Sequence, residues 1–352
     1  MSLRHFSAPR LRRSLLLTSL LLAGSFTVHA DEMLRKAVGK GAYEMAISQQ
    51  DNALWVATSQ SRSADKGGVI YRLDPQTLEA TLAVHSEAKP FGATINNQTQ
   101  TLWFGNSVNG AVTAVDAKTG EVKGRLALDD RKRSETVKPL QPRELVADEK
   151  HNTVYISGVG KESVIWVVDG ANLTLKATIS GTGNRSTALA LDGDAQRLYT
   201  VSADGELVTI DTASNRILSR KKLVGDSKEH AFLNIALDSA SHRAFITDFK
   251  QPEMLVVDYR DGKVLAKVAA PESLAVLFNP VRNEIYATHR KAGSVSVIDG
   301  KSYKVVKTLD TPTYPNSLAL STDGKTLYVT VKQASTREKE AALADDVIRI
   351  ML

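Results

Sequence analysis

The chain lacks cysteine entirely, although it is 352 residues long. No disulfide can brace it, and no cysteine-ligated zinc or iron–sulfur centre can form within it. Aromatic residues are also scarce, at 6% of the sequence, whereas hydrophobic residues make up 42%. A chain of this length can bury a large apolar core without cross-links. We therefore expect its folding stability to come from packing.

Long hydrophobic runs are absent after the first thirty residues. Four arginines between positions 4 and 13 precede an apolar run at 15–28, which ends in Val28-His29-Ala30. The run is shorter than the roughly 20 residues that a membrane span needs, and this order of charged, apolar and small residues is typical of a secretory signal peptide. We predict that residues 1–30 are a signal peptide cleaved after Ala30, that the protein is periplasmic, and that the mature chain has no transmembrane segment.

An excess of one charge sign is also missing once this leader is set aside. The whole chain has 45 basic and 39 acidic residues, a net charge of +6. Four of the basic residues and none of the acidic ones lie in the leader, so residues 31–352 carry only +2. Net charge alone therefore predicts no nucleic-acid partner, and only an uneven distribution of charge could favour one.

The sequence does contain a repeat. An apolar residue followed by an aromatic one recurs seven times at intervals of 41 to 52 residues, at Leu54-Trp55, Leu102-Trp103, Val154-Tyr155, Leu198-Tyr199, Ala244-Phe245, Ile285-Tyr286 and Leu327-Tyr328. A second marker, an aspartate at the end of another strand-like run, alternates with the first at Asp74, Asp116, Asp169, Asp211, Asp258 and Asp299. Each unit thus contains four strand-like segments, which we call A, B (with the aromatic residue), C (ending in Asp) and D.

Units of this length with four strands are typical of β-propeller blades. One such sheet cannot cover its own two faces, and radial stacking buries both. The last unit has segments A, B and C at 316–321, 326–331 and 347–351 but no D, whereas "MLRKAVG" at 33–39 resembles a D segment without a unit. We predict that 33–39 completes the seventh blade and leaves no open sheet edge. The predicted fold class is all-β, a seven-bladed β-propeller with four-stranded blades, with residues 31–352 as its single domain.

The loops of a propeller fall into two groups. The A–B and C–D turns lie on one face, and here they are short and rich in Asp and Gly, which favour turns. The D–A and B–C loops lie on the other face, and here they are long. Acidic residues interrupt their candidate cations, which are Arg62, Lys66, Lys89, Arg131, Lys132, Arg133, Lys138, Arg143, Lys161, Arg185, Lys228, Lys250, Arg290, Lys291 and Lys332.

The mouth of the central channel is expected on the long-loop face. Aligning the A segments on their apolar residues places Tyr43, Phe91, Arg143, Thr187, Leu233, Leu274 and Asn316 in one ring. Aromatic rings beside cations suit an unpaired nucleic-acid strand, because bases stack on rings and phosphates need positive charge. The alternative is that Tyr43 and Phe91 only plug the channel.

Catalytic and metal-binding patterns are weak. No histidine pair has the spacing of a helical metal site, although His230 and His289 could meet across the mouth. An enzyme would need converging His, Glu and Arg side chains or a metal, and only Glu44 and Glu144 fall near Arg143 in the alignment. We predict no enzymatic activity, no cofactor and no metal.

The segment "LYVT" at 327–330 and its variants resemble the YVTN-type, WD40-like repeat of bacterial exported propellers. With stretches such as "MLRKAVGKGAYEMA" and "VGKESVIWVVDG", residues 31–352 are similar to the YncE-like family of periplasmic seven-bladed propellers. The resemblance implies DNA binding, with single strands as the favoured form.

We therefore predict a periplasmic protein that binds single-stranded DNA, without sequence preference, or another polyanion, on the D–A/B–C loop face. The predicted binding residues are Tyr43, Phe91, Arg131, Lys132, Arg133, Arg143, Arg185, His230, Arg290, Lys291 and Asn316. One alternative is a periplasmic protein- or peptide-interaction module with an envelope protein partner and no enzymatic activity. A propeller hydrolase or lactonase is the third.

Overall fold

The structure, a computed structural model, describes residues 1–2 and 33–352 apart from 64, 133 and 337. Residues 31–352 form one compact unit. The predicted signal peptide and its cleavage site lie, but for residues 1–2, outside the described residues and stay predictions.

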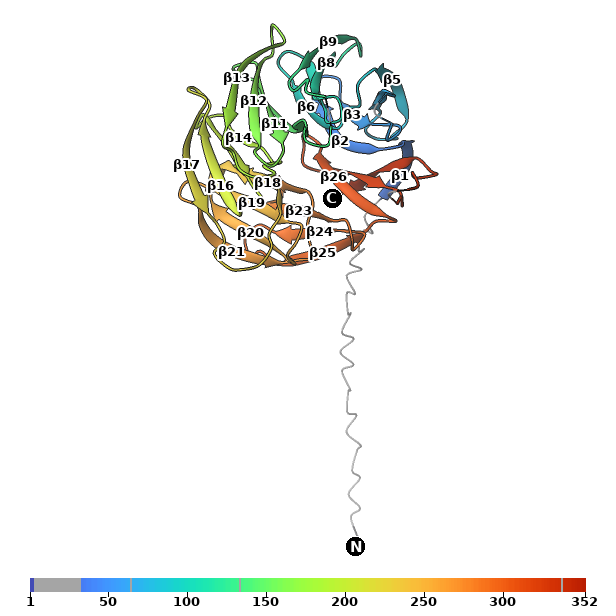
Figure 1. The fold of residues 1–352 in the computed structure, drawn as a ribbon. Coiled ribbons are helices and arrows are strands. Elements are labelled where there is room, and N and C mark those ends of the chain that lie inside the picture. The colour runs from blue at the N-terminus through green and yellow to red at the C-terminus, as the bar shows by residue number, and fades with distance from the viewer. Residues whose placement is uncertain (3–32, 64, 133, 337) are drawn as a thin grey trace. The chain divides into compact units, whose positions relative to one another are not determined.

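The compact unit is a ring of seven antiparallel four-stranded sheets, or blades, arranged around a central channel (Figure 1). The A strands of neighbouring blades contact one another around the channel, and the D strands lie outermost. Blades 1 to 7 consist, in the order A to D, of β2 (Ala42–Ser48), β3 (Ala53–Thr58), β4 (Gly68–Leu73) and β5 (Ala80–Ser86); β6 (Gly92–Asn96), β7 (Thr101–Asn106), β8 (Ala111–Asp116) and β9 (Val122–Ala127); β10 (Gln141–Asp148), β11 (Thr153–Val159), β12 (Val164–Asp169) and β13 (Thr174–Ser180); β14 (Ala190–Asp192), β15 (Arg197–Val201), β16 (Glu206–Asp211) and β17 (Arg216–Lys222); β18 (Phe232–Asp238), β19 (Arg243–Asp248), β20 (Glu253–Asp258) and β21 (Lys263–Ala269); β22 (Val276–Asn279), β23 (Glu284–His289), β24 (Ser294–Asp299) and β25 (Val305–Asp310); and β26 (Tyr314–Leu320), β27 (Thr326–Lys332), β28 (Asp345–Met351) and β1 (Met33–Gly39).

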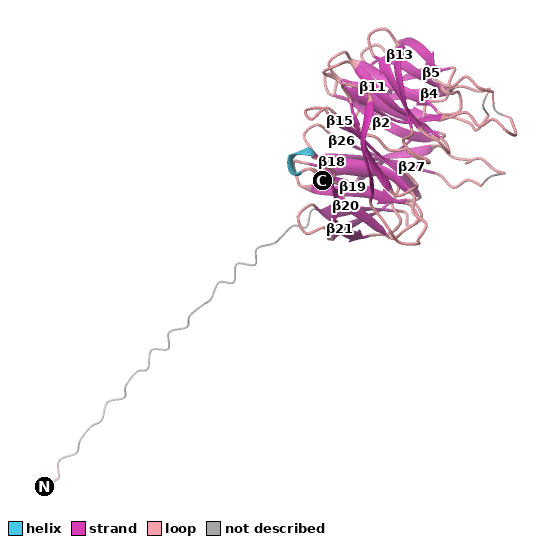
Figure 2. Ribbon diagram, turned by 60° about the vertical axis from the view of Figure 1, so that its left-hand side comes forward, coloured by secondary structure: helices cyan, strands magenta, loops and turns pink. Residues whose placement is uncertain are grey.

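The two groups of loops lie on opposite faces of the ring. Long loops extend from one side in Figure 2, whereas short turns and a 3₁₀ helix, η1 (Ser239–Ser241), close the other. We call these faces the mouth end and the turn end. The charged segment at 335–346 has no helix among its described residues.

The ring closes as predicted. Strand β1 pairs with β28 in antiparallel register, from Met33 opposite Ile350 to Gly39 opposite Asp345. The Arg35 guanidinium contacts the Asp346 carboxylate at 2.5 Å across this pairing. The N-terminal strand thus supplies the fourth strand that the last unit lacks, and the all-β seven-bladed fold class is confirmed.

The core is divided into seven apolar clusters, one at each junction between blades. Each cluster contains one of the seven repeated aromatic side chains, none of which is more than 3% exposed. Trp55 of blade 1, for example, packs on Leu102 and Phe104 of blade 2. The aromatic repeat therefore reports the packing between blades, as predicted.

The repeated aspartates are structural residues of the turn end. The Asp169 carboxylate accepts hydrogen bonds from the backbone amides of Ala171 and Asn172, both at 2.9 Å. The same pattern follows Asp74, Asp116 and Asp299. These amide contacts hold the pKa of Asp169 below its usual range. The turn preference of Asp accounts for the repeat without a ligand.

Candidate functional site at the channel mouth

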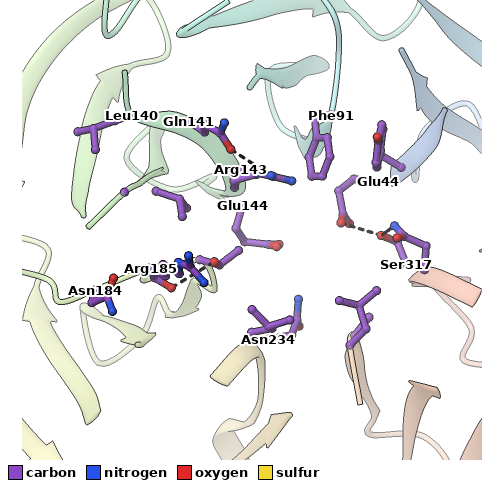
Figure 3. Close-up of a pocket in the computed structure, with 18 of the residues that line it drawn as sticks. Glu44, Phe91, Leu140, Gln141, Arg143, Glu144, Asn184, Arg185, Asn234 and Ser317 are labelled. Atoms are coloured by element: carbon purple, nitrogen blue, oxygen red, sulfur yellow. Dashed lines mark hydrogen bonds between the residues drawn. The ribbon is translucent and has the colours of Figure 1, made fainter. Parts of the chain in front are cut away.

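The channel opens at the mouth end into a cavity of about 1200 Å³. All seven residues of the predicted ring line it: Tyr43, Phe91, Arg143, Thr187, Leu233, Leu274 and Asn316. The alignment of the A segments therefore located the mouth correctly. Figure 3 shows side chains from several blades converging on this space.

A β-bulge sets the lining of the cavity in blade 3. Pro142 pairs with Gly158 and Leu145 with Ile156, so Arg143 and Glu144 together oppose the single residue Ser157. A bulge re-aims side chains, and both bulge residues line the cavity. Blades 1, 5 and 7 have the same irregularity, at Tyr43-Glu44, Leu233-Asn234 and Asn316-Ser317.

Strand B stabilises the bulges of blades 3, 5 and 7 with a hydroxyl group. The extra residue of a bulge leaves a backbone amide without a strand partner. The amide of Glu144 donates to Ser157 Oγ at 3.0 Å, and that of Ser317 donates to Thr330 Oγ1 at 3.0 Å. Thr330 is the final residue of "LYVT". The Ser or Thr two places after the repeated aromatic residue was thus the sequence signal for the bulges of blades 3, 5 and 7 and for Glu144, Asn234 and Ser317 in the cavity. Blade 1 has Ala57 at that place, and the Glu44 amide donates instead to the Phe91 carbonyl at 3.1 Å.

Four side chains form a continuous stack on one side of the mouth. The Tyr43 and Phe91 rings lie 3.9 Å apart between centroids, at an angle of 32°. Lys332 Nζ lies 3.8 Å from the Tyr43 centroid, and Arg143 Cζ lies 4.2 Å from that of Phe91. Because two groups cannot share one ring face, each ring has a cation on one face and an aromatic ring on the other. We call this group the cation–aromatic stack.

The two cations of the stack are held differently. Lys332 is 12% exposed and contacts the Asp345 carboxylate at 3.0 Å and the Ala42 carbonyl at 3.1 Å. Arg143 donates to the side-chain oxygen of Gln141 at 3.1 Å, and burial lowers its pKa. An ion pair therefore anchors Lys332, whereas Arg143 is hydrogen-bonded to a neutral side chain and interacts with the charge of Glu44 without a direct ion pair.

Two carboxyl groups lie beside this stack. The Glu44 carboxylate accepts a hydrogen bond from Ser317 Oγ at 2.6 Å. Burial raises the pKa of Glu44, against the opposing effects of Ser317 and of the charge on Arg143. Burial, and then the charge of Glu44, raise the pKa of Glu144 well above its usual range. We call Glu44 and Glu144 the carboxyl pair.

Most predicted binding residues reach the cavity. Tyr43, Phe91, Arg143 and Asn316 line it within the ring, and Arg131, Arg185 and Arg290 line it from the loops. Lys138, Lys161 and Lys332 bring the lining cations to seven, against the carboxyl pair and Glu162. The Arg131 guanidinium pairs with Asp129 at 2.5 Å and holds the pKa of that carboxyl at about 2.

Three predicted binding residues lie elsewhere. Lys132 is exposed on the long D–A loop but does not line the cavity. Lys291 also lies outside it, 3.2 Å from the Glu272 carboxylate and above the Phe249 ring. The third, His230, is 5% exposed, and its ring nitrogens contact Asp226 at 2.7 Å and Asp248 at 2.6 Å. The remaining predicted residue, Arg133, lies outside the described residues.

The suggested meeting of His230 and His289 across the mouth is wrong. His289 is fully buried, and its Nε2 lies 2.8 Å from Ser296 Oγ. Lys89, counted from sequence among the loop cations, is also buried, and its ammonium group donates to the Ser59 and Ser61 carbonyls. A position in a mouth-end loop therefore did not predict an exposed side chain, because these side chains are buried where they hold the loops against the blades.

Neither a metal-binding cluster nor a membrane-spanning helix is found in the described part of the chain. No group of three or more His, Cys, Asp or Glu residues there could hold a metal ion. No helix within those residues is long and apolar enough to cross a membrane.

Fold and site together define a seven-bladed β-propeller with a cation-rich channel mouth. The model of the YNCE-like β-propeller family matches residues 53–350. The YncE proteins of Salmonella typhimurium and Escherichia coli K12 are each 73% identical over 353 residues, covering the whole of both chains. The chain therefore belongs to the YNCE-like β-propeller family, as the "LYVT" repeat indicated.

More distant similarities concern part of the chain or the fold alone. Antigen Lp49 of Leptospira interrogans is 26% identical over 200 residues, which are 54% of this chain and 42% of that protein. A chain of Kuenenia stuttgartiensis hydrazine synthase superimposes with a TM-score of 0.71 at 15% identity, covering 84% of this chain and 94% of that one. At this identity the likeness shows the fold only.

Proposed function

We propose that the protein is a periplasmic binding protein, not an enzyme, and that its channel mouth binds single-stranded DNA or another polyanion without sequence preference. The observation that carries this proposal is the lining of the cavity, which contains seven cations and two aromatic rings. The periplasmic location rests on the leader sequence at 1–30.

Electrostatics would supply most of the affinity. Each phosphate neutralised by Lys or Arg releases a counterion, so affinity falls as the salt concentration rises. Arg185, Lys138 and Lys161 are exposed at the rim and suit this role. The small net charge of residues 31–352 does not oppose the proposal, because the cations gather at one site.

Base stacking would require a local rearrangement. Both faces of each ring in the cation–aromatic stack are occupied. Arg143 is the cation that can leave more readily, since a phosphate can replace the neutral Gln141 as its partner. Its departure would expose one face of Phe91 to a base, whereas Lys332 would stay paired with Asp345.

Fluorescence anisotropy of a labelled oligothymidylate at two salt concentrations tests the proposal. We expect binding that weakens steeply as salt rises. Phe91→Ala should weaken it by about 1–3 kcal/mol if a base stacks on that ring. Leu274→Ala is the matched control, because it trims another ring residue that has no π face. No binding by the wild-type protein at low salt would refute the proposal.

A second arm distinguishes the protein-partner alternative. Heparin and a double-stranded oligonucleotide compete for the wild-type protein in the same assay. Competition by both with equal strength would favour a general polyanion site. An envelope protein captured by the wild-type protein, and lost on charge reversal of Arg185 and Arg290, would favour an interaction module.

A further inference from the structure

The carboxyl pair is an unusual feature of a mouth that is otherwise cationic. Glu44 and Glu144 lie in the bulges of blades 1 and 3, one position after Tyr43 and Arg143. Figure 3 shows both carboxyl groups directed into the space between the blades. Ser317 donates to Glu44, and no described side chain donates a hydrogen bond to the Glu144 carboxyl group.

The charged groups around the pair determine how it responds to a ligand. Arg143, in the same bulge as Glu144, is the cation whose charge acts on Glu44. Blades 5, 6 and 7 contribute uncharged residues to the inner lining, namely Leu233, Asn234, Leu274, Ala275, Asn316 and Ser317. The other ionisable groups that face the cavity are Tyr43, Arg131, Lys138, Lys161, Glu162, Arg185, Arg290 and Lys332.

A polyanion in this mouth would act on the pair in two ways. Its phosphates would add negative charge and exclude water beside two half-buried carboxyl groups, and both effects favour the protonated form. A phosphate that draws Arg143 towards itself would also remove the cation that stabilises ionised Glu44. The ligand and the pair compete for the same guanidinium.

We propose that Glu44 and Glu144 make the mouth a proton-coupled polyanion site, in which the pair takes up a proton when the ligand binds, so that affinity rises as pH falls. This inference rests on the proposed function of the same cavity. The sign follows from linkage: a group that binds protons more tightly in the complex than in the free protein makes the complex more stable at lower pH. Burial raises the pKa of both groups in the free protein, which brings the uptake closer to neutral pH.

The test uses labelled oligothymidylate, because thymine does not gain a proton in acid. Anisotropy titrations from pH 5.5 to 8.5 at constant ionic strength should show affinity falling as pH rises, by at most about tenfold per pH unit for one proton. Glu144→Gln should flatten this dependence and bind more tightly than wild type at pH 8.5.

Two controls separate the pair from other titrating groups. Glu162→Gln changes the net charge equally at an exposed position of the same cavity, and should strengthen binding evenly without changing the pH slope. His230→Asn removes a buried imidazole outside the cavity and should keep the slope. Calorimetric titration of wild type in two buffers of different ionisation enthalpy measures the proton uptake directly, without any variant.

The outcomes are distinct. Weaker binding by Glu144→Gln at pH 8.5 would overturn the inference, because the carboxylate would then contact the ligand directly. Wild-type binding with no proton uptake would overturn it as well, while leaving the polyanion site in place. An absence of binding at every pH and at low salt would instead refute the proposed function.

Discussion

Carboxyl groups at the two ends of the propeller differ in how they are satisfied. At the turn end, Asp169 accepts hydrogen bonds from two backbone amides, which lower its pKa. At the mouth, Glu144 receives no hydrogen bond from a described side chain, and burial beside Glu44 raises its pKa. The turn aspartates stabilise the ionised form within the fold itself. Glu144 lacks such hydrogen bonds from described side chains, and Glu44 depends on Ser317 and on the charge of Arg143, which leaves the pair able to respond to a ligand.

The blade junctions also differ from the mouth, because their side chains are fully packed within the fold. We therefore expect the largest effect of any substitution to be a loss of stability at a junction. Phe245 is fully buried at the junction of blades 5 and 6, and Phe245→Ala should cost about 3–5 kcal/mol of unfolding free energy. Chemical denaturation measures the loss. Phe245→Leu, which retains most of the buried volume, should cost much less.

A junction variant that still folds should bind oligothymidylate as wild type does. Equal losses of stability and affinity would show that junction and mouth are not independent.

The two classes of carboxyl group should give opposite pH dependences of stability. A lowered folded-state pKa, as at Asp169, contributes stability above the unfolded pKa that is lost as pH falls through the folded pKa. Asp169→Asn should thus be less stable than wild type at pH 7, by about 0.5–1.5 kcal/mol, and equal to it in strong acid. A raised folded-state pKa, as at Glu144, lowers stability as pH rises through it.

Glu144→Gln should accordingly be more stable than wild type at pH 8, and the difference should vanish in acid, where Glu144 is protonated in both the folded and the unfolded chain. Thermal melts of the three proteins from pH 3 to pH 8 measure both trends. A Glu144→Gln variant less stable than wild type at pH 8 would contradict the assignment of Glu144 as a carboxyl without compensating partners.

Periodicity revealed the blades, because each repeat must present the same apolar residues to its neighbours. It also located the ring at the channel mouth, since its seven residues, one from each blade, occupy equivalent backbone positions. It placed Glu44 and Glu144 near Arg143. It did not predict that Asn234 and Ser317 line the cavity, because a bulge shifts register by one and breaks the alternation from which facing is inferred. Nor did it predict that Lys89 would be buried, or that His230 would hold two carboxylates. Those outcomes depend on contacts between distant loops.

The smallest expected effect compares exposed lysines at the two ends. Lys161 lines the cavity, whereas Lys301 lies in a turn of blade 6 at the turn end. Lys161→Gln and Lys301→Gln change the net charge equally. Loss of one phosphate contact should lower the slope of log affinity against log salt by about 1 for Lys161→Gln. Lys301→Gln should leave the slope unchanged, because a charge more than a Debye length, about 8–10 Å, from the ligand is screened. Equal slopes in the two variants would place the bound strand away from the mouth, and a lower slope in Lys301→Gln alone would place it at the turn end.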